Sequence, residues 1–86
     1  MESKLTINEH GHKYWYLNGE LHREDGPAVE HIGVAKAWYL NGELHREDGP
    51  AVEHIDGYRG WYINGKEYTE QEYKYKTRSR KLKKLL

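Results

Sequence analysis

Four residues with reactive side chains stand side by side twice in this chain. His22-Arg23-Glu24-Asp25 returns as His45-Arg46-Glu47-Asp48, so each copy places an imidazole, a guanidinium and two carboxylates within four positions. A histidine general base oriented by a carboxylate, next to an arginine that binds phosphate, requires these residue types. We call residues 22–25 and 45–48 the HRED segments. They predict either ion pairing within the scaffold or capture of a small phosphorylated ligand.

The duplication favours the structural role. Asp25 and Asp48 precede Gly-Pro and can accept backbone N–H bonds in a turn, while the arginines can pair with an acid on a neighbouring hairpin. Enzymes seldom repeat their reactive groups along a sheet, so we expect a non-enzymatic chain with no catalytic residues. Ligand binding is the alternative. Its candidate residues are His22, Arg23, His45 and Arg46.

Histidines outside the HRED segments do not make a convincing metal site. His10-Gly11-His12 surrounds a turn glycine, and Glu30-His31 and Glu53-His54 are neighbours on predicted strands. The first pair has no fixed common direction, and neighbours on a strand point to opposite faces of a sheet. The chain also has no cysteine, which removes thiolate ligands and disulfides. We expect no bound metal and no other cofactor.

The HRED segments lie inside a longer repeat. Residues Trp15 to Ile32 return unchanged as Trp38 to Ile55, and residues 61–65 repeat the opening once more, which gives a period of 23 residues. Each Asn-Gly predicts a type I′ hairpin turn, and each Asp-Gly-Pro ends a strand because proline lacks an N–H. The sequence therefore predicts a mainly all-β fold, a single-layer antiparallel meander of hairpin repeats.

The pattern changes after the third Asn-Gly. Thr69 and Glu72 form a capping box, which predicts a helix from about Glu70 to near Leu85. We therefore divide the chain into a sheet, residues 1–68, with repeats that start near Trp15, Trp38 and Trp61, and an amphipathic basic helix, residues 69–86.

Alternation along each strand sends Trp and Leu to one face and the intervening Tyr to the other. The predicted core consists of Trp15, Trp38, Trp61, Leu17, Leu40 and Ile63. The other face carries Tyr16, Tyr39 and Tyr62. This tyrosine ladder is either a partly covered back face or an aromatic recognition surface.

Charge is distributed unevenly although the formal net charge is zero. Residues 73–86 contain seven Lys or Arg and no acid, while residues 1–72 carry the other seven bases and all fourteen acids. With a mean hydropathy of -1.13, the chain has no apolar run long enough for a signal peptide or a membrane span. We expect a cytoplasmic protein that does not enter membranes.

The basic tail is a candidate partner-binding or nucleic-acid-binding site, because lysines and arginines interleaved with tyrosines suit a phosphate backbone. Its candidate residues are Tyr73, Lys74, Lys76, Arg78, Arg80, Lys81, Lys83 and Lys84. The same helix could lie on the acidic sheet of its own chain, join a second copy in a homodimer, or bind an acidic host protein. Of the separate partners, a host protein is the one we favour.

The WYxNG openings, the 23-residue spacing and the expected hairpins resemble MORN-type repeats. The chain is more similar to the divergent relatives built on HRxDGPA in small phage and giant-virus proteins, which often end, as here, in NGKEYTE and a helix. The likeness covers Trp15 to about Glu72. It implies a curved single-layer sheet with a non-enzymatic binding role, in a phage accessory protein that inhibits or redirects a host component, such as a defence component, in the host cytoplasm. MORN repeats normally carry a second glycine-aromatic element where this chain has HREDGPA, so lipid binding does not carry over.

Overall fold

The computed structural model describes the backbone of residues 2–85 and the side chains of residues 2–78. Ten short strands precede one helix. The strands are β1 (Lys4–Ile7), β2 (Lys13–Leu17), β3 (Glu20–Leu21), β4 (Val29–His31), β5 (Ala35–Ala37), β6 (Tyr39–Leu40), β7 (Glu43–Leu44), β8 (Val52–His54), β9 (Arg59–Ile63) and β10 (Lys66–Tyr68). The helix is α1 (Glu70–Leu85).

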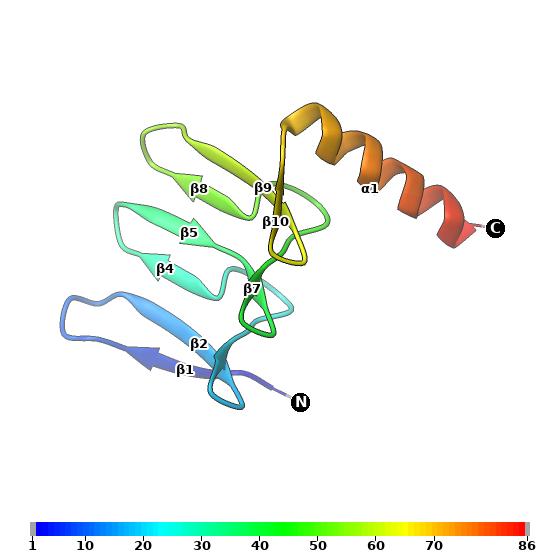
Figure 1. The fold of residues 1–86 in the computed structure, drawn as a ribbon. Helices are drawn as coiled ribbons and strands as arrows, with labels where there is room; N and C mark the ends of the chain where they lie inside the picture. Colours follow the sequence, from blue (N-terminus) through cyan, green and yellow to red (C-terminus); the bar gives the residue numbers. More distant parts are fainter. Residues whose placement is uncertain (1, 86) are drawn as a thin grey trace.

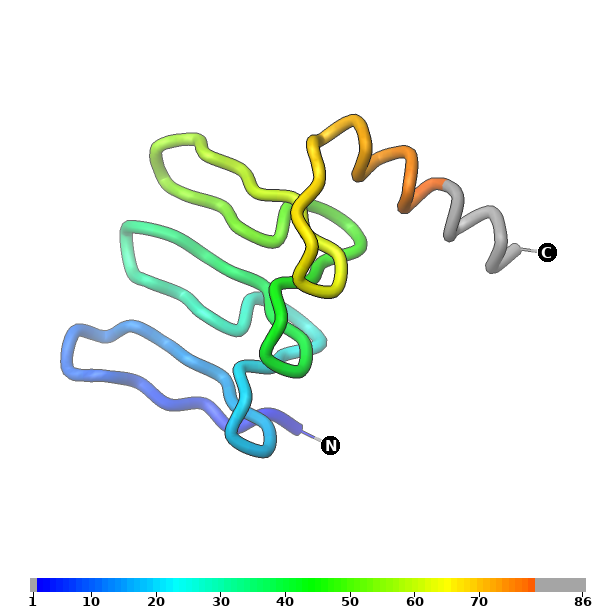
Figure 2. The backbone as a smooth tube through the Cα atoms, in the orientation of Figure 1, coloured from blue at the N-terminus to red at the C-terminus, as the bar shows by residue number. Residues whose placement is uncertain are grey.

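The strands form an antiparallel meander, as the sequence predicts. The main sheet has the order β1-β2-β4-β5-β8-β9-β10, with β3 paired to β2, and β6 and β7 pair with each other. Figure 1 shows the result as long hairpins stacked one above another, with α1 leaving the last of them. The tube in Figure 2 makes the repetition plain, because each long hairpin is followed by a small tight loop. The molecule is thin, with extents of 45 × 33 × 18 Å.

The tryptophan of each repeat marks the point where a strand changes its partner. In β2, Lys13 and Tyr14 pair with β4, whereas Tyr16 and Leu17 pair with β3. The Trp15 N–H between them donates to the Ala28 carbonyl at 2.8 Å. In the second repeat the break is complete, so the segment that corresponds to β2 is divided into β5 and β6 around Trp38.

The Asn-Gly turns confirm the sequence prediction. Asn18, Asn41 and Asn64 have φ angles of 52, 52 and 49°, and the glycines that follow them are positive as well. A type I′ turn requires positive φ at both central residues, and asparagine and glycine are the residues that tolerate it best. Three tight hairpins of identical geometry therefore hold β2 to β3, β6 to β7 and β9 to β10.

The predicted tryptophan core is only partly right. Ile63 is buried, but the three tryptophans together with Leu17 and Leu40 are half-buried. Among the described residues, the structure buries Ala28, Ala51, Gly60, Ile63, Tyr73, His22 and His45. A sheet one layer thick has no second layer to cover large side chains, so the space beside each tryptophan is closed by small residues and by the HRED segments.

The helix begins where the capping box places it. The Thr69 N–H donates to Glu72 Oε1 at 2.8 Å, and the Glu72 N–H donates to Thr69 Oγ1 at 3.1 Å. These bonds stabilise the ionised carboxyl and lower the pKa of Glu72. One turn later Tyr73 is only 3% exposed, and its ring packs on Trp61 with centroids 5.0 Å apart. The start of α1 is therefore part of the same body as the sheet.

Replacing Tyr73 should destabilise the whole chain. Tyr73→Ala removes a buried aromatic ring and should cost about 3–5 kcal/mol of unfolding free energy. Tyr73→Phe keeps the ring but leaves the Gly49 N–H and the Arg46 carbonyl without their partner, at about 1–3 kcal/mol. Chemical denaturation followed by tryptophan fluorescence measures both.

The matched control is Tyr75, which lies two residues further along the same helix and is 78% exposed. Tyr75→Ala and Tyr75→Phe should change stability by less than about 0.5 kcal/mol. Equal losses at positions 73 and 75 would contradict the docking of α1 described here.

Candidate functional site

The HRED segments join one repeat to the next. The Arg23 N–H donates to the Tyr39 carbonyl at 3.1 Å, and the Gly42 N–H donates back to the Leu21 carbonyl at 2.9 Å. Between these bonds, Nδ1 of His22 accepts the Asn41 N–H at 2.9 Å. His22 is 7% exposed, so its ring is a buried acceptor for the neighbouring turn. The histidine is a junction residue of the scaffold.

The second junction repeats the first. The Arg46 N–H donates to the Tyr62 carbonyl at 3.2 Å, the Gly65 N–H donates to the Leu44 carbonyl at 2.8 Å, and Nδ1 of His45 accepts the Asn64 N–H at 3.0 Å. Two independent copies of one geometry show that the 23-residue period is a structural unit.

Each arginine of an HRED segment covers the tryptophan of its own repeat. The Arg23 guanidinium carbon lies 3.8 Å from the Trp15 ring centroid, and Arg46 lies 3.7 Å from Trp38. Arg46 also bonds to Asp48 at 3.0 Å, to the Pro50 carbonyl at 3.0 Å and to Glu53 on β8 at 2.9 Å. The predicted ion pairing is confirmed, and the guanidinium replaces the missing second layer over the indole.

Asp25 and Asp48 have a different role from the one predicted. Their carboxylates accept from the arginine Nε of the same segment, at 3.0 Å in each copy, in place of turn N–H groups. Glycine at position 26 is explained by the small space between the loop and the Arg23 side chain. A Cβ atom at this position would stand 3.0 Å from the Arg23 guanidinium carbon, so a larger residue 26 would require the guanidinium to shift.

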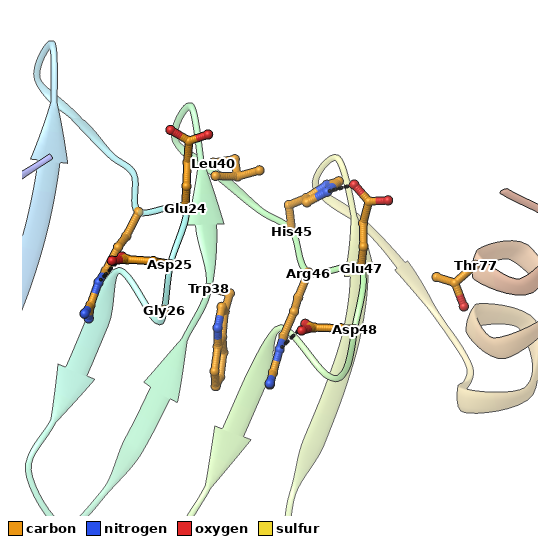
Figure 3. A pocket seen from close by; sticks show the side chains of 11 residues that line it. Glu24, Asp25, Gly26, Trp38, Leu40, His45, Arg46, Glu47, Asp48 and Thr77 are labelled. Atoms are coloured by element: carbon orange, nitrogen blue, oxygen red, sulfur yellow. Dashed lines mark hydrogen bonds and ion pairs between the residues drawn. The ribbon is translucent and has the colours of Figure 1, made fainter. Parts of the chain in front are cut away.

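The two HRED segments border an open cleft of about 660 Å³ (Figure 3). Its lining consists of Arg23, Glu24, Asp25, Gly26, Trp38, Leu40, His45, Arg46, Glu47, Asp48 and Thr77. Four of these residues are acidic, and both arginines are already held by carboxylates of their own repeats. Of the four predicted ligand residues, Arg23, His45 and Arg46 line this cavity and His22 does not. The rim of that cavity is acidic, which disfavours a phosphorylated ligand.

One face of the sheet carries a row of alternating charges. Cross-strand partners have side chains on the same face, and the register of the sheet links one such row across five strands. The row consists of Lys13, Glu30, Lys36, Glu53 and Arg59. It lies on the same face as the tryptophans, because Lys13 and Trp15 are two residues apart on β2. We call this the ionic face.

The opposite face is aromatic and apolar. The neighbouring row runs from Tyr14 through Val29, Ala37 and Val52 to Gly60. Over Gly60 a Cβ atom would stand 3.0 Å from the Tyr62 ring and 3.1 Å from the Tyr58 hydroxyl, so both side chains lie across that glycine. We call this the tyrosine face. It consists of Tyr14, Tyr16, Val29, Ala37, Tyr39, Val52, Tyr58 and Tyr62.

The tyrosine face is partly exposed. Tyr16 is 38% exposed and Tyr58 is 49% exposed, while Tyr39 and Tyr62 are half-buried. Burial raises the pKa of Tyr62, with smaller contributions from Glu67, Tyr58 and Tyr39, which indicates that the phenols are close to one another. The sequence predicted the ladder of residues 16, 39 and 62. It missed the valines and the alanine, although their alternation with Glu and Lys is the period-2 signal of a two-sided strand.

The structure describes only some of the side chains of the site predicted on the basic helix. Lys74, Lys76 and Arg78 are exposed, and Lys74 pairs with Glu70 at 3.2 Å. Tyr73 was predicted as a contact residue, and that prediction is wrong, because the side chain is buried against Trp61. The remaining candidates lie outside the described side chains. They are Arg80, Lys81, Lys83 and Lys84.

Near the tip of the first hairpin, His12 and His31 lie close to each other although they are far apart in the sequence. The His12 and His31 rings have centroids 4.7 Å apart, and His31 Nε2 is 2.8 Å from the Tyr14 hydroxyl. Nδ1 of His12 accepts the Ile32 N–H at 3.0 Å. Among the residues that the structure describes, no group of three or more metal-binding side chains has a geometry that could hold an ion.

Known proteins supply no family for this chain. No protein-family model matches it, and neither a curated protein nor a solved structure gives a match. The likeness to MORN-type repeats therefore stays a prediction from sequence. Within the described part of the chain, no helix has the length and apolar character to cross a membrane.

Removing a junction histidine should weaken the stack. His45→Ala leaves the Asn64 N–H without its acceptor in a buried position, which should cost about 1–3 kcal/mol. His45→Asn places an amide oxygen near the position of Nδ1 and should recover part of that loss. Thermal unfolding followed by far-ultraviolet circular dichroism measures both.

His10→Ala is the control for these variants, since that side chain is exposed and near the tip of the first hairpin. It should leave the melting temperature unchanged. If His45→Ala were as stable as His10→Ala, the histidines would not be holding the repeats together.

Proposed function

We propose that this chain is a non-enzymatic binding module that occupies the surface of a protein partner through its tyrosine face. The observation that carries this proposal is that, among the described elements, none covers that face. Apart from the β6–β7 hairpin, the described element outside the main sheet is α1, and its buried anchor Tyr73 packs on Trp61, which belongs to the ionic face. A sheet normally buries its apolar face against another element.

The size of the core supports the need for a partner. No large side chain among the described residues is fully buried, and the buried hydrophobic residues are Ala28, Ala51, Ile63 and Tyr73. A chain of this size gains little stability from such a core alone. Tyrosines with half-exposed rings are typical of protein interfaces, since they bury a large area and keep a hydroxyl for hydrogen bonding.

The state of the HRED segments supports a non-enzymatic role. Both histidines accept a backbone N–H of the next repeat, and both arginines are stacked on tryptophans and bonded to carboxylates. The Nδ1 atoms and the guanidinium groups are therefore committed to the scaffold, which disfavours catalysis and phosphate binding. The resemblance to phage and giant-virus repeats suggests a partner in a host cell, and inhibition or redirection of that partner is the mode of action we favour.

Introducing a positive charge on the tyrosine face should weaken partner binding without unfolding the sheet. In Tyr16→Lys a cation replaces a partly exposed ring at the end of the face, and Val29→Lys introduces one at its centre. Purified wild-type chain captures the partner from a host lysate, and the captured protein is then prepared separately for titration. Each variant should weaken binding at least tenfold, because a lysine at an interface core is desolvated without a partner.

Tyr75→Lys is the control, because it makes the same replacement at an exposed tyrosine on the helix. It should bind as wild type does. A partner that tolerates both face variants but is lost with Tyr75→Lys would move the binding surface to α1 and overturn the proposal.

Nucleic-acid binding by the helix is a second candidate, supported by the exposed Lys76 and Arg78. It predicts a mobility shift that weakens steeply as salt rises, because cationic side chains release counterions from the phosphate backbone. Deleting the chain from Thr77 onward should remove the shift and keep Tyr73 in place. A truncated chain that still shifts DNA or RNA would rule this candidate out.

A further inference from the structure

The first two Asn-Gly turns have the same neighbours in sequence but different neighbours in space. Residues 15–25 and 38–48 are identical, and Asn18, Asn41 and Asn64 have φ angles of 52, 52 and 49°. All three asparagines are exposed, so access of water does not distinguish them. A chemical difference between Asn18 and Asn41 must therefore come from the contacts that the fold makes around each turn.

The second and third turns are tied to the repeat before them. The Gly42 N–H donates to the Leu21 carbonyl at 2.9 Å, and the Asn41 N–H donates to Nδ1 of His22 at 2.9 Å. The third turn makes both equivalent bonds, at 2.8 and 3.0 Å. A glutamate side chain of the preceding repeat also lies beside the glycine of each of these turns. Both turns are therefore held in place by their neighbours.

The first turn lacks these contacts. Within the part of the chain that the structure describes, no hydrogen bond joins the Asn18 N–H or the Gly19 N–H to another element. A Cβ atom on Gly19 would meet nothing within 4 Å, whereas one on Gly42 would stand 2.9 Å from the Glu20 carboxylate. In Figure 2 the small tight loops lie in a row, and the loop of residues 18–19 is at one end of it.

We propose that Asn18 is a site of spontaneous deamidation, and that the stacking of repeats protects Asn41 and Asn64 from the same reaction. The Gly19 nitrogen attacks the side-chain carbonyl carbon of Asn18 and forms a C–N bond. The N–H proton and the side-chain amino group leave together as ammonia. One water molecule then opens the cyclic succinimide at either carbonyl, which gives aspartate or its β-linked isomer, isoaspartate. Glycine favours the attack because it has no side chain to hinder the nitrogen.

The hydrogen bonds of the later turns oppose this reaction. The glycine nitrogen becomes a nucleophile as it gives up its proton, and at Gly42 that proton is held by the Leu21 carbonyl. The turn must therefore open locally before the ring can close, which breaks this bond together with the bond to His22. The turn at Gly19 opens without that loss.

Deamidation at this position changes the first tight hairpin, in which Tyr16 of β2 pairs with Leu21 of β3. Isoaspartate adds one carbon atom to the backbone of a two-residue turn, so the turn no longer has type I′ geometry. Aspartate keeps the backbone and adds a negative charge. Because Tyr16 belongs to the tyrosine face, the reaction alters one end of that face. The reaction itself depends on the turn alone and not on the function proposed for the face.

The test follows the three asparagines in one sample. The intact chain is incubated under native conditions at mildly alkaline pH, digested with trypsin and analysed by mass spectrometry. Cleavage after Lys and Arg places each asparagine in its own peptide, residues 14–23, 37–46 and 60–66. Asn18 should be converted at least about fivefold faster than the other two, because two hydrogen bonds hold each of their turns.

The same chain in urea is the matched control. Asn18 and Asn41 should then react at equal rates, since residues 15–25 and 38–48 are identical and the stack is gone. Equal rates at the two positions in the native chain, or a difference that persists in urea, would refute the proposal. This comparison requires only the wild-type chain.

Two junction variants show whether the protection is local. His22→Ala removes the acceptor of the Asn41 N–H and should speed conversion of Asn41 but not of Asn64. His45→Ala should do the reverse, because it removes the acceptor of the Asn64 N–H. If either variant accelerated both positions to the same extent, the junction bonds would not be the source of the protection, and the proposal would be wrong.

Discussion

The stack of hairpins depends on a buried histidine accepting a backbone N–H from the turn of the next repeat. Nδ1 of His22 and of His45 receives the N–H of Asn41 and of Asn64, at 2.9 and 3.0 Å. This bond fixes the distance between successive Asn-Gly turns, and with it the register of the strands on either side. The arginine next to each histidine then covers the tryptophan of its own repeat. One short segment thus supplies both the contact between repeats and the cover for the indole.

A sheet one layer thick must find other ways to shield its apolar side chains, and this chain treats its two faces differently. On the ionic face, stacked guanidinium groups and a row of opposed charges close the surface around the tryptophans. On the tyrosine face, the side chains of Tyr58 and Tyr62 lie across Gly60, and Tyr16 and Tyr58 leave part of their surface in water. Only the second face therefore gains from a further layer, which is why the proposed partner is placed there.

In the sequence, Tyr73 looks like part of the basic tail, but its role follows from its position at the end of the stack. The third repeat has no HRED segment, so Trp61 lacks the arginine that covers its counterparts, and the last strands face no following turn. Tyr73 supplies both missing functions, since its ring packs on Trp61 and its hydroxyl bonds to the preceding loop. Repeat arrays generally require an altered final unit for this reason. The first turn of α1 therefore caps the stack of repeats. This role does not depend on what the exposed Lys and Arg side chains of the helix bind.

The sequence by itself determined the period, the turns and the start of the helix, because asparagine-glycine pairs, Asp-Gly-Pro and a capping box act through local backbone geometry. Local signals are short-range, so Glu70–Leu85 and the three hairpins were predictable from neighbouring residues alone. Only the tertiary structure decided what the repeated reactive groups do. His22 meets a residue nineteen positions away and Tyr73 meets Gly49 across twenty-four, and such pairings depend on how the repeats stack. The same stacking left the tryptophans half-buried, because a single-layer sheet has no second layer to cover large side chains. It placed Tyr73 inside because Trp61, at the end of the stack, has no arginine to cover it.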